Sequence, residues 1–340
     1  MKRPPLLALA LALLAPLAQL ALFPPAPAEA GVTLRASQVL PADHPSQLAL
    51  IRLGELLKEG SQGEMELSIV DSREFGGERE LIEASQMGEL DLIVTGTAAL
   101  YGFTSDFLVF DLPYVFPDLR TAREVTDSPF GLNVLDKALV MGLKGLAYYE
   151  NGMRNVSANI PARLPEDLKG LPFRTMESRI HLETFRALGA NAVPLSFSEL
   201  YDHLKKGLLE GEENPVSIFM TGKLYETQKY YSLTGHFYTT SPVFINLSVW
   251  NKLDQGQKDL ILKCARESAL YQRELLDEFD SPAAMDALRE KVTVISDIDR
   301  GIWKRAVSGV REKFEAEVGE ETLSLFDEAL KTAANENPVK

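Results

Sequence analysis

The segment from residue 167 to residue 215 constrains the fold of this chain more than any other. A short apolar run ending in Phe173-Arg174 leads into a helical stretch, and a second run at 192–195 leads into another helix. The residues Glu213-Asn214-Pro215 that follow have the composition of a turn. This order predicts a β-α-β-α unit, and open α/β sheets bind small ligands beyond the carboxyl ends of their strands. Arg174 lies at such an end, which makes it the first candidate ligand contact.

Alternating segments also fill the chain before residue 152. We predict strands at 32–37, 65–70, 90–95 and 146–149, helices at 46–58 and 78–87, a buried loop at 103–116, and a two-piece helix at 119–143 broken near Pro129. The β-α-β-α-β order predicts a parallel sheet with crossover helices. Arg154 follows the predicted strand at 146–149, so a second arginine is expected just past a strand end.

The remaining residues supply further elements of both kinds. We predict strands at 230–234, 242–247 and 292–295, and helices at 219–228, 254–279, 302–314 and 321–333. Two α/β sets joined by repeated crossings typically form two lobes with a hinge and a cleft. We therefore expect one lobe to comprise residues 31–151 plus about 240–279, and the other to comprise 152–239 plus about 280–340.

The N-terminal residues have the pattern of a secretory signal peptide. Lys2 and Arg3 precede the apolar stretch Leu6–Leu22, and Ala28-Glu29-Ala30 is a small-x-small cleavage signature. We predict a cleaved signal peptide at 1–30; the alternative is an uncleaved anchor, against which Pro16 interrupts the apolar run. The single cysteine, Cys264, forms no intramolecular disulfide and is expected to be buried, which fits a bacterial periplasmic protein.

Several classes of function are disfavoured by what the sequence lacks. A net charge of −14 argues against a nucleic-acid partner. There is no Walker A loop, no G-x-G-x-x-G and no G-x-S-x-G elbow. The four histidines have no metal-ligand spacing, and His181 and His203 are expected to be exposed helix residues. The sequence therefore predicts no cofactor, no metal site and no catalysis.

The motifs of the central segment resemble those of a known family. The strings LPEDLKGLPFR, FRALGANAVPLSFSELYDHL and EGEENP, with FGGERELIEASQMGELDL, FDLPYVF and YYENGMRN upstream, are similar to the solute-binding proteins of tripartite ATP-independent periplasmic (TRAP) transporters, the C4-dicarboxylate-binding-protein family. The resemblance covers essentially the whole mature chain. It implies an α/β, two-lobed periplasmic binding protein fold with a hinged central cleft and a long interlobe helix.

The same resemblance implies a set of ligand-binding residues. Arg174 corresponds to the arginine that grips the ligand carboxylate, and Arg154 to a second family arginine. The other positions that match family ligand contacts are Asn214, Phe197 and Glu78; we add Gln38, Thr97 and Tyr238 as weaker candidates for the far end of the pocket. Simpler interpretations stay open: a surface ion pair for Arg174, and ordinary core for Phe197.

For two of these residues, a structural role at a helix end is the alternative to ligand binding. Asn214 precedes Pro215 and suits a helix cap, and Glu78 suits a helix N-terminus. The sequence departs from the family pattern at Thr175-Met176 and at Glu212, where the family has Gln. A negative charge at Glu212 near the pocket leaves the class of ligand open.

These observations lead to one main hypothesis and two alternatives. The main one is a monomeric periplasmic receptor that binds a small organic acid, such as a dicarboxylate, hydroxy acid or sugar acid, and delivers it to TRAP permease subunits in the membrane. The first alternative is a ligand sensor that serves a histidine kinase. The second is a periplasmic α/β enzyme, for which the sequence offers no nucleophile motif.

Overall fold

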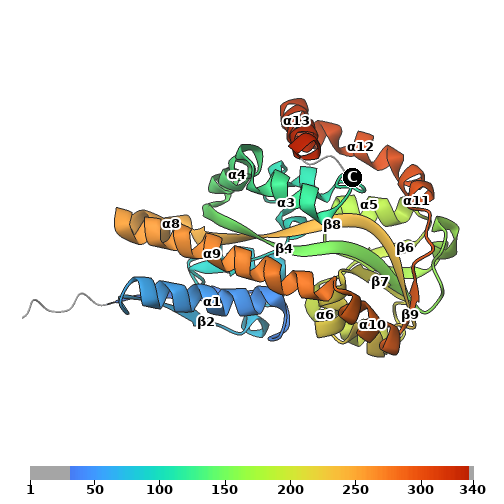
Figure 1. Ribbon diagram of the computed structural model, residues 1–340, viewed down its shortest axis with the longest axis horizontal. Coiled ribbons are helices and arrows are strands. Elements are labelled where there is room, and N and C mark those ends of the chain that lie inside the picture. The colour runs from blue at the N-terminus through green and yellow to red at the C-terminus, as the bar shows by residue number, and fades with distance from the viewer. Residues whose placement is uncertain (1–30, 337–340) are drawn as a thin grey trace, which may run out of the picture.

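The computed structural model describes residues 31–336, so the predicted signal peptide lies outside the described residues. One mixed sheet forms the centre, in the order β2-β1-β3-β8-β4-β7-β5-β6, with β9 pairing with β8 (Figure 1). The strands are β1 (Val32–Ser37), β2 (Met65–Ile69), β3 (Leu92–Val94), β4 (Leu143–Ala158), β5 (Pro172–Thr175), β6 (Asn191–Pro194), β7 (Gly211–Asn214), β8 (Tyr230–Asn246) and β9 (Thr293–Ile295). The predicted α/β architecture is confirmed.

Two long antiparallel strands, β4 and β8, run through both halves of the molecule. The prediction of separate strands at 230–234 and 242–247 was wrong, because the polar residues between them are buried within β8, where Thr240 and Ser241 are hydrogen-bonded to β4. The prediction that Arg154 lies past a strand end was also wrong. The segment around Gly152, which has a φ of 100°, is a register irregularity inside β4, and the strand continues to Ala158.

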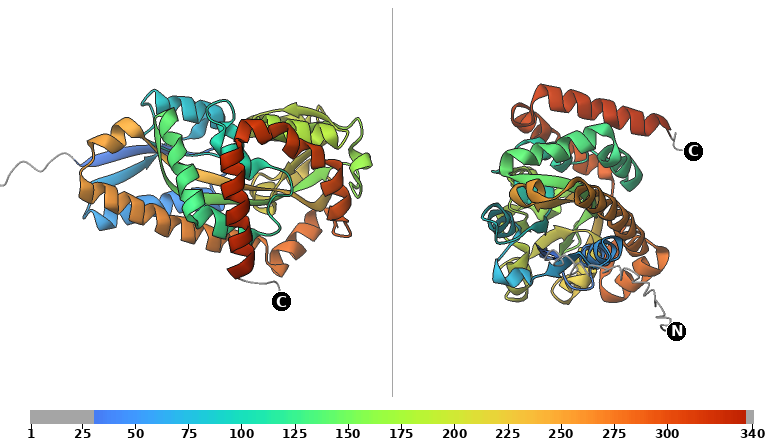
Figure 2. Two further views of the ribbon diagram at one scale, coloured as in Figure 1. Left: turned by 90° about the horizontal axis from the view of Figure 1, so that it is seen from above. Right: turned by 90° about the vertical axis from the view of Figure 1, so that its left-hand side faces the viewer.

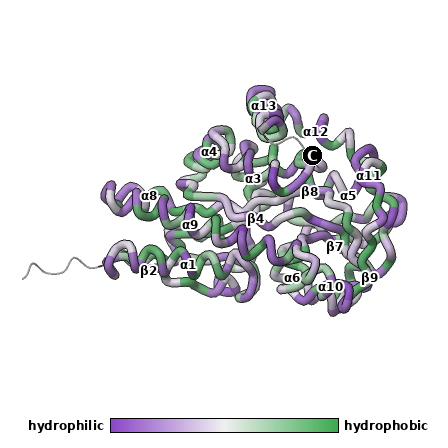
Figure 3. The backbone as a smooth tube through the Cα atoms, viewed as in Figure 1, coloured by the Kyte–Doolittle hydropathy of each residue, from purple (hydrophilic) through white to green (hydrophobic). Residues whose placement is uncertain are grey.

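The first half of the molecule surrounds β1, β2 and β3. Helix α1 (Pro45–Gly60) buries Leu50, Leu53 and Leu57 in a core shared with α9 (Gln255–Phe279). Figure 3 shows apolar and polar residues alternating along these two helices, as expected for amphipathic helices that cover a sheet. Cys264 lies buried in this core, as predicted.

The second half surrounds β5, β6 and β7. The helices here are α5 (Arg179–Ala187), α6 (Phe197–Lys205), α7 (Val216–Thr221) and α10 (Pro282–Lys291). A separate core of this half includes Leu200, Phe219 and Tyr231. The long helix α9 extends from α1 in the first half to α7 and α10 in the second, so it spans both halves (Figure 1).

The C-terminal helices return across the molecule. The predicted helix at 302–314 is two helices, α11 (Arg300–Ala306) and α12 (Ser308–Val318), and α13 (Glu320–Glu336) follows. Phe326 of α13 packs against Phe110, Phe116 and Phe130, so α13 covers α3 (Leu119–Asp127) and α4 (Pro129–Asp136) (Figure 2). The remaining helices are α2 (Glu78–Gln86) and α8 (Leu247–Lys252). Within residues 31–336, no helix combines the length and apolarity needed to cross a membrane.

Candidate ligand-binding site

A small cavity lies where the two halves meet. Its volume is about 20 Å³, and it is lined by Val39, Leu40, Glu78, Asn151, Arg154, Arg174, Met176, Phe197, Asn214 and Ile218. The five main candidates from the sequence are all among these residues. The structure therefore brings together side chains from β4, β5, β7 and the first residues of α2 and α6. A cavity between two halves of an α/β protein, lined by apolar side chains and a few polar ones, is a typical place for a small ligand.

Arg174, near the end of β5, has unused hydrogen-bonding capacity. Its Nε donates to the carbonyl oxygen of Leu195 at 2.8 Å, and its side chain is almost fully buried at 3% exposure. Among residues 31–336 the structure shows no partner for the two terminal nitrogens of this guanidinium. Burial lowers the pKa of Arg174, and nearby carboxylates partly offset that effect. A guanidinium stays charged in proteins. The two terminal nitrogens of Arg174 are therefore available to donate hydrogen bonds to an anionic ligand.

Arg154, on β4, already has its charge paired inside the protein through two of its three guanidinium nitrogens, Nε and Nη2, and within residues 31–336 the structure shows no partner for Nη1. Its Nε donates to Oε2 of Glu213 at 2.5 Å, and its Nη2 donates to Oε1 of Glu213 at 2.9 Å. The same Nη2 also donates to Oδ1 of Asn214 at 3.1 Å. Both members of the ion pair are at most 1% exposed. The bidentate pairing neutralises Arg154 inside the protein, so this residue borders the cavity without offering it a free charge.

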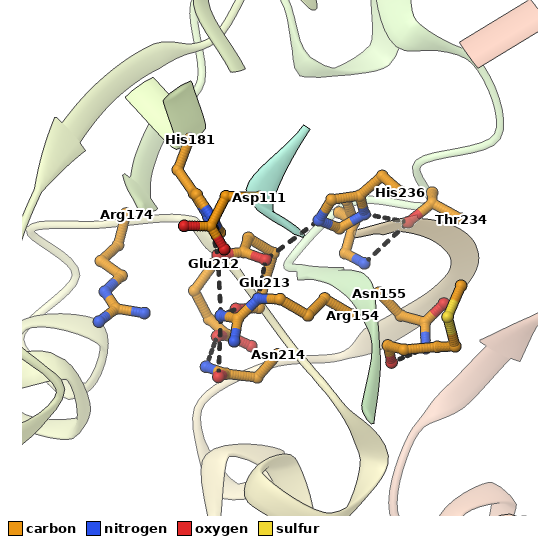
Figure 4. A network of polar contacts seen from close by, with 12 residues as sticks. Asp111, Arg154, Asn155, Arg174, His181, Glu212, Glu213, Asn214, Thr234 and His236 are labelled. Atoms are coloured by element: carbon orange, nitrogen blue, oxygen red, sulfur yellow. Dashed lines mark hydrogen bonds and ion pairs between the residues drawn. The ribbon is translucent and has the colours of Figure 1, made fainter. Parts of the chain in front are cut away.

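Glu213 is the centre of a buried polar cluster behind the cavity (Figure 4). His236 Nε2 lies 3.0 Å from Glu213 Oε2, and its Nδ1 lies 2.7 Å from Thr234 Oγ1. Burial alone would raise the pKa of Glu213, but Arg154, His181 and His236 outweigh it and hold that pKa well below its usual range. Glu213 is therefore ionised at neutral pH and compensates Arg154.

The prediction that His181 is exposed was wrong. Its ring is fully buried, stacked on Phe237, with Nδ1 3.7 Å from Glu213 Oε1 and Nε2 4.0 Å from Asp111 Oδ1. Burial alone would lower the pKa of His181, but Asp111 and Glu213 raise it above its ordinary value. His181 lies on the inward-packing face of α5, beside the buried Ile180, Thr184 and Phe185. The prediction considered His181 alone and not its position on this face.

Glu78 and Asn214 both line the cavity, and Glu78 also lies in the first turn of α2, where a negative charge is favourable. Glu78 Oε1 accepts from the backbone N–H of Gly96 at 2.7 Å, and burial raises the pKa of this carboxyl. Asn214 is the last residue of β7, not part of a turn, and the N-cap of α7 is Pro215. The capping interpretation of Asn214 is therefore wrong, because its side chain bonds to Arg154 and Glu212.

Phe197, the first residue of α6, is half-buried and forms an apolar wall of the cavity. The three weaker candidates lie outside the lining. Gln38 bonds to the carbonyl of Leu40 and to Gln47, Thr97 donates to Asp111 at 2.7 Å, and Tyr238 donates to Glu150 at 3.0 Å. Sequence reasoning did not single out the lining residues Val39, Leu40, Asn151, Met176 and Ile218. Asn151 and Met176 each lie within three residues of an arginine of the site, and that spacing was the available signal.

Comparison with known proteins identifies the family. Residues 36–317 match the DctP model, bacterial extracellular solute-binding protein family 7, which includes the binding proteins of TRAP transporters. The chain belongs to this family, as its motifs predicted. The family consists of binding proteins rather than enzymes, and the two-lobed periplasmic binding fold is confirmed with it.

Three relatives illustrate the similarity. The 2,3-diketo-L-gulonate-binding periplasmic protein YiaO of Escherichia coli is 32% identical over 286 residues, which cover 83% of this chain and 87% of that protein. The sugar acid binding protein DctPAm of Advenella mimigardefordensis, solved with galactonate, has a TM-score of 0.85 and 31% identity and covers 89% of this chain and 99% of its own. A TRAP solute-binding protein of Shewanella oneidensis, solved with succinate, has a TM-score of 0.83 and 26% identity, covering 89% and 99%.

Proposed function

We propose that this protein is the periplasmic receptor of a TRAP transporter, and that it binds a small organic acid through Arg174 and delivers it to a membrane permease. The observation that carries the proposal is the buried Arg174 guanidinium, which borders the cavity and makes one hydrogen bond, to Leu195, within residues 31–336. A carboxylate can accept two parallel hydrogen bonds from such a group. The ligand would therefore be oriented as well as attracted.

The other cavity residues suit the rest of an acid of this kind. Glu78 has one carboxylate oxygen engaged by Gly96, and the other can accept from a ligand hydroxyl. Asn214 adds an amide donor, and Phe197 covers the carbon skeleton. Dicarboxylates, hydroxy acids and sugar acids all fit this description. The relatives solved with galactonate and succinate, and the E. coli protein named for diketogulonate, support this range.

We also propose that the two lobes close over the ligand about a hinge in β4 and β8, with the lobes divided near residues 151 and 240. Contacts between the halves support this division. A methyl group at Gly77, at the start of α2, would collide with Ser196 at the start of α6. His44, the N-cap of α1, lies 3.3 Å from Ser217 of α7 through its Nε2. These contacts belong to a closed arrangement, which removes water and strengthens the carboxylate–guanidinium pair.

Calorimetric titration of the mature protein against a panel of mono- and dicarboxylic acids tests the proposal. We expect micromolar or tighter binding of at least one acid, and its loss in Arg174→Ala. The matched control is Arg186→Ala, which removes an exposed arginine of α5 and should bind as the wild type does. Wild-type affinity in Arg174→Ala would refute the anchor.

The two other functions make different predictions. An enzyme would convert the bound acid, so recovery of intact ligand from denatured protein argues against it. A histidine-kinase sensor would bind the same acid, and neighbouring genes for a kinase instead of permease subunits would favour it.

A further inference from the structure

Glu212 is a buried carboxylate that the proposed site does not yet use. It is fully inaccessible to solvent, and its Oε2 accepts from Nδ2 of Asn214 at 2.5 Å. Its Oε1 accepts from the hydroxyl of Ser157 on β4. Both partners are donors, so the geometry suits an ionised carboxylate. A carboxylate at this depth is rare without a cation bonded to it, and its two bonds here are to neutral groups.

These bonds fix the orientation of the Asn214 amide. Oδ1 of Asn214 accepts from Arg154 Nη2 at 3.1 Å, while Nδ2 donates to Glu212. Rotating the amide by half a turn would place donor against donor at Arg154 and acceptor against acceptor at Glu212. The second hydrogen of Nδ2 is therefore the donor of Asn214 that remains free, and a ligand oxygen can accept a hydrogen bond from it.

The charges around the cavity limit the charge of the ligand. Arg154 is already paired with Glu213, so Arg174 is the cation that faces Glu212 across the site. An ionised Glu212 therefore offsets the positive charge of Arg174 before an acid enters. A monocarboxylate adds one negative charge beside Arg174, and a dicarboxylate adds two in the same small cavity. Uncompensated like charges at this range weaken binding strongly in a buried site.

We propose that Glu212 determines the ligand specificity of this site: it holds an N–H of Asn214 toward the ligand, and its negative charge disfavours acids with a second carboxylate. The proposal rests on the proposed function and narrows it to hydroxylated monocarboxylates, whose hydroxyl groups Glu78 and Asn214 can bind.

The charge of Glu212 changes within the neutral range. Its pKa is raised to about 7, chiefly by burial and also by the neighbouring Glu213, while Ser157, Arg174 and Asn214 partly offset this rise. The other groups that face it are Arg154 of β4 and Tyr231 of β8. Discrimination against a second carboxylate should therefore be strongest at pH 8 and weaker at pH 6, where Glu212 is largely neutral.

The test compares acids that differ only in the second carboxylate. D-Erythronate and meso-tartrate share a four-carbon skeleton, with a hydroxymethyl group in one and a carboxylate in the other; galactonate and galactarate form a six-carbon pair. Calorimetry gives the ratio of the two Kd values within the pair that binds. In Glu212→Gln the amide can accept from Asn214 and donate to Ser157, so both bonds persist and only the charge is lost. Glu210→Gln removes an exposed charge from the same segment and is the matched control.

At pH 8 we expect the wild type and Glu210→Gln to prefer the monoacid at least tenfold. In Glu212→Gln the Kd for the monoacid should stay within about threefold of the wild-type value. The ratio of the diacid Kd to the monoacid Kd should fall at least tenfold. Glu212→Ala should weaken both acids at least tenfold, because Nδ2 of Asn214 loses its acceptor and only Arg154 still holds the amide. An unchanged ratio in Glu212→Gln overturns this proposal alone, whereas absence of binding to every acid overturns the proposed function with it. If Glu212→Gln does not fold, the wild-type ratio at pH 6 and pH 8 decides, and a constant ratio refutes the proposal.

Discussion

Two arginines border the same cavity, and their surroundings differ. Arg154 lies in the middle of β4 and is held by both oxygens of Glu213. Arg174 lies near the end of β5, and its only hydrogen bond within the described residues is to Leu195. Both are buried to nearly the same extent. Burial of an arginine therefore does not by itself indicate a ligand contact. A buried arginine is a candidate ligand contact when its charge has no hydrogen-bonded carboxylate partner inside the protein.

Replacing Arg154 should have the largest effect, and it should fall on the fold. Arg154→Met leaves the Glu213 carboxylate buried without its cation, and breaking a buried pair in this way costs about 3–5 kcal/mol. Chemical denaturation of the ligand-free protein measures this loss. An unfolding free energy equal to that of the wild type would show that the two arginines do not differ in the way described.

Replacing Arg174 should affect binding instead. Arg174→Met removes two charge-assisted hydrogen bonds to the ligand, worth about 3 kcal/mol or more together, so the Kd should rise at least ~100-fold. The melting temperature of the ligand-free protein should stay the same or rise, because a buried charge without an internal partner is lost. A melting temperature well below that of the wild type would assign Arg174 a structural role.

The carboxylates beside the arginines should also differ, in the pH dependence of stability. Glu212 has a pKa of about 7 in the folded protein against an ordinary 4.5. The free energy of unfolding is therefore unaffected by this group below pH 4.5, and it falls as the pH rises towards 7, because the buried carboxyl resists ionisation. Glu212→Gln should therefore be more stable than the wild type by about 3 kcal/mol at pH 8, with a much smaller difference at pH 5. Thermal unfolding at both pH values, with Glu210→Gln as control, measures this.

The smallest effect is expected at the contact between the halves. Gly77→Ala is compatible with the local backbone, where φ is −94° and ψ is −169°, but its methyl group meets Ser196 in the closed arrangement. We expect binding to weaken by about 1 kcal/mol, roughly fivefold, with the fold unaffected. Gly77→Ala combined with Ser196→Gly should restore the affinity; failure to do so would place the contact outside the closing motion.

The sequence was most informative where a local pattern is sufficient. Arg174 follows an apolar run, so its place at a strand end was predictable from neighbouring residues. The two halves of β8 were predicted as separate strands because the polar Thr239, Thr240 and Ser241 interrupt the apolar pattern. These residues are buried, and Thr240 donates to the carbonyl of Tyr149 while Ser241 donates to Asn151. Such partners come from β4, about 90 residues away, and no local pattern reports them.

The cluster around Glu213 was unpredictable for the same reason. Asp111, Arg154, His181 and His236 come from four separate elements, and each is unremarkable in its own segment. The family resemblance supplied the five cavity residues by position. It did not reveal that the charge of Arg154 is already neutralised, because that depends on a side-chain pairing and not on residue identity.

The irregular register of β4 has a mechanical consequence. Its pairing with β8 shifts between Glu150 and Gly152 and again between Arg154 and Val156, so regular ladder bonds are interrupted twice within seven residues. The same segment contributes Asn151 and Arg154 to the cavity wall. The irregular part of the strand that joins the halves therefore also lines the cavity. An occupant would stiffen it directly, and slower hydrogen exchange of the amides at 150–156 would report occupancy from within the protein backbone.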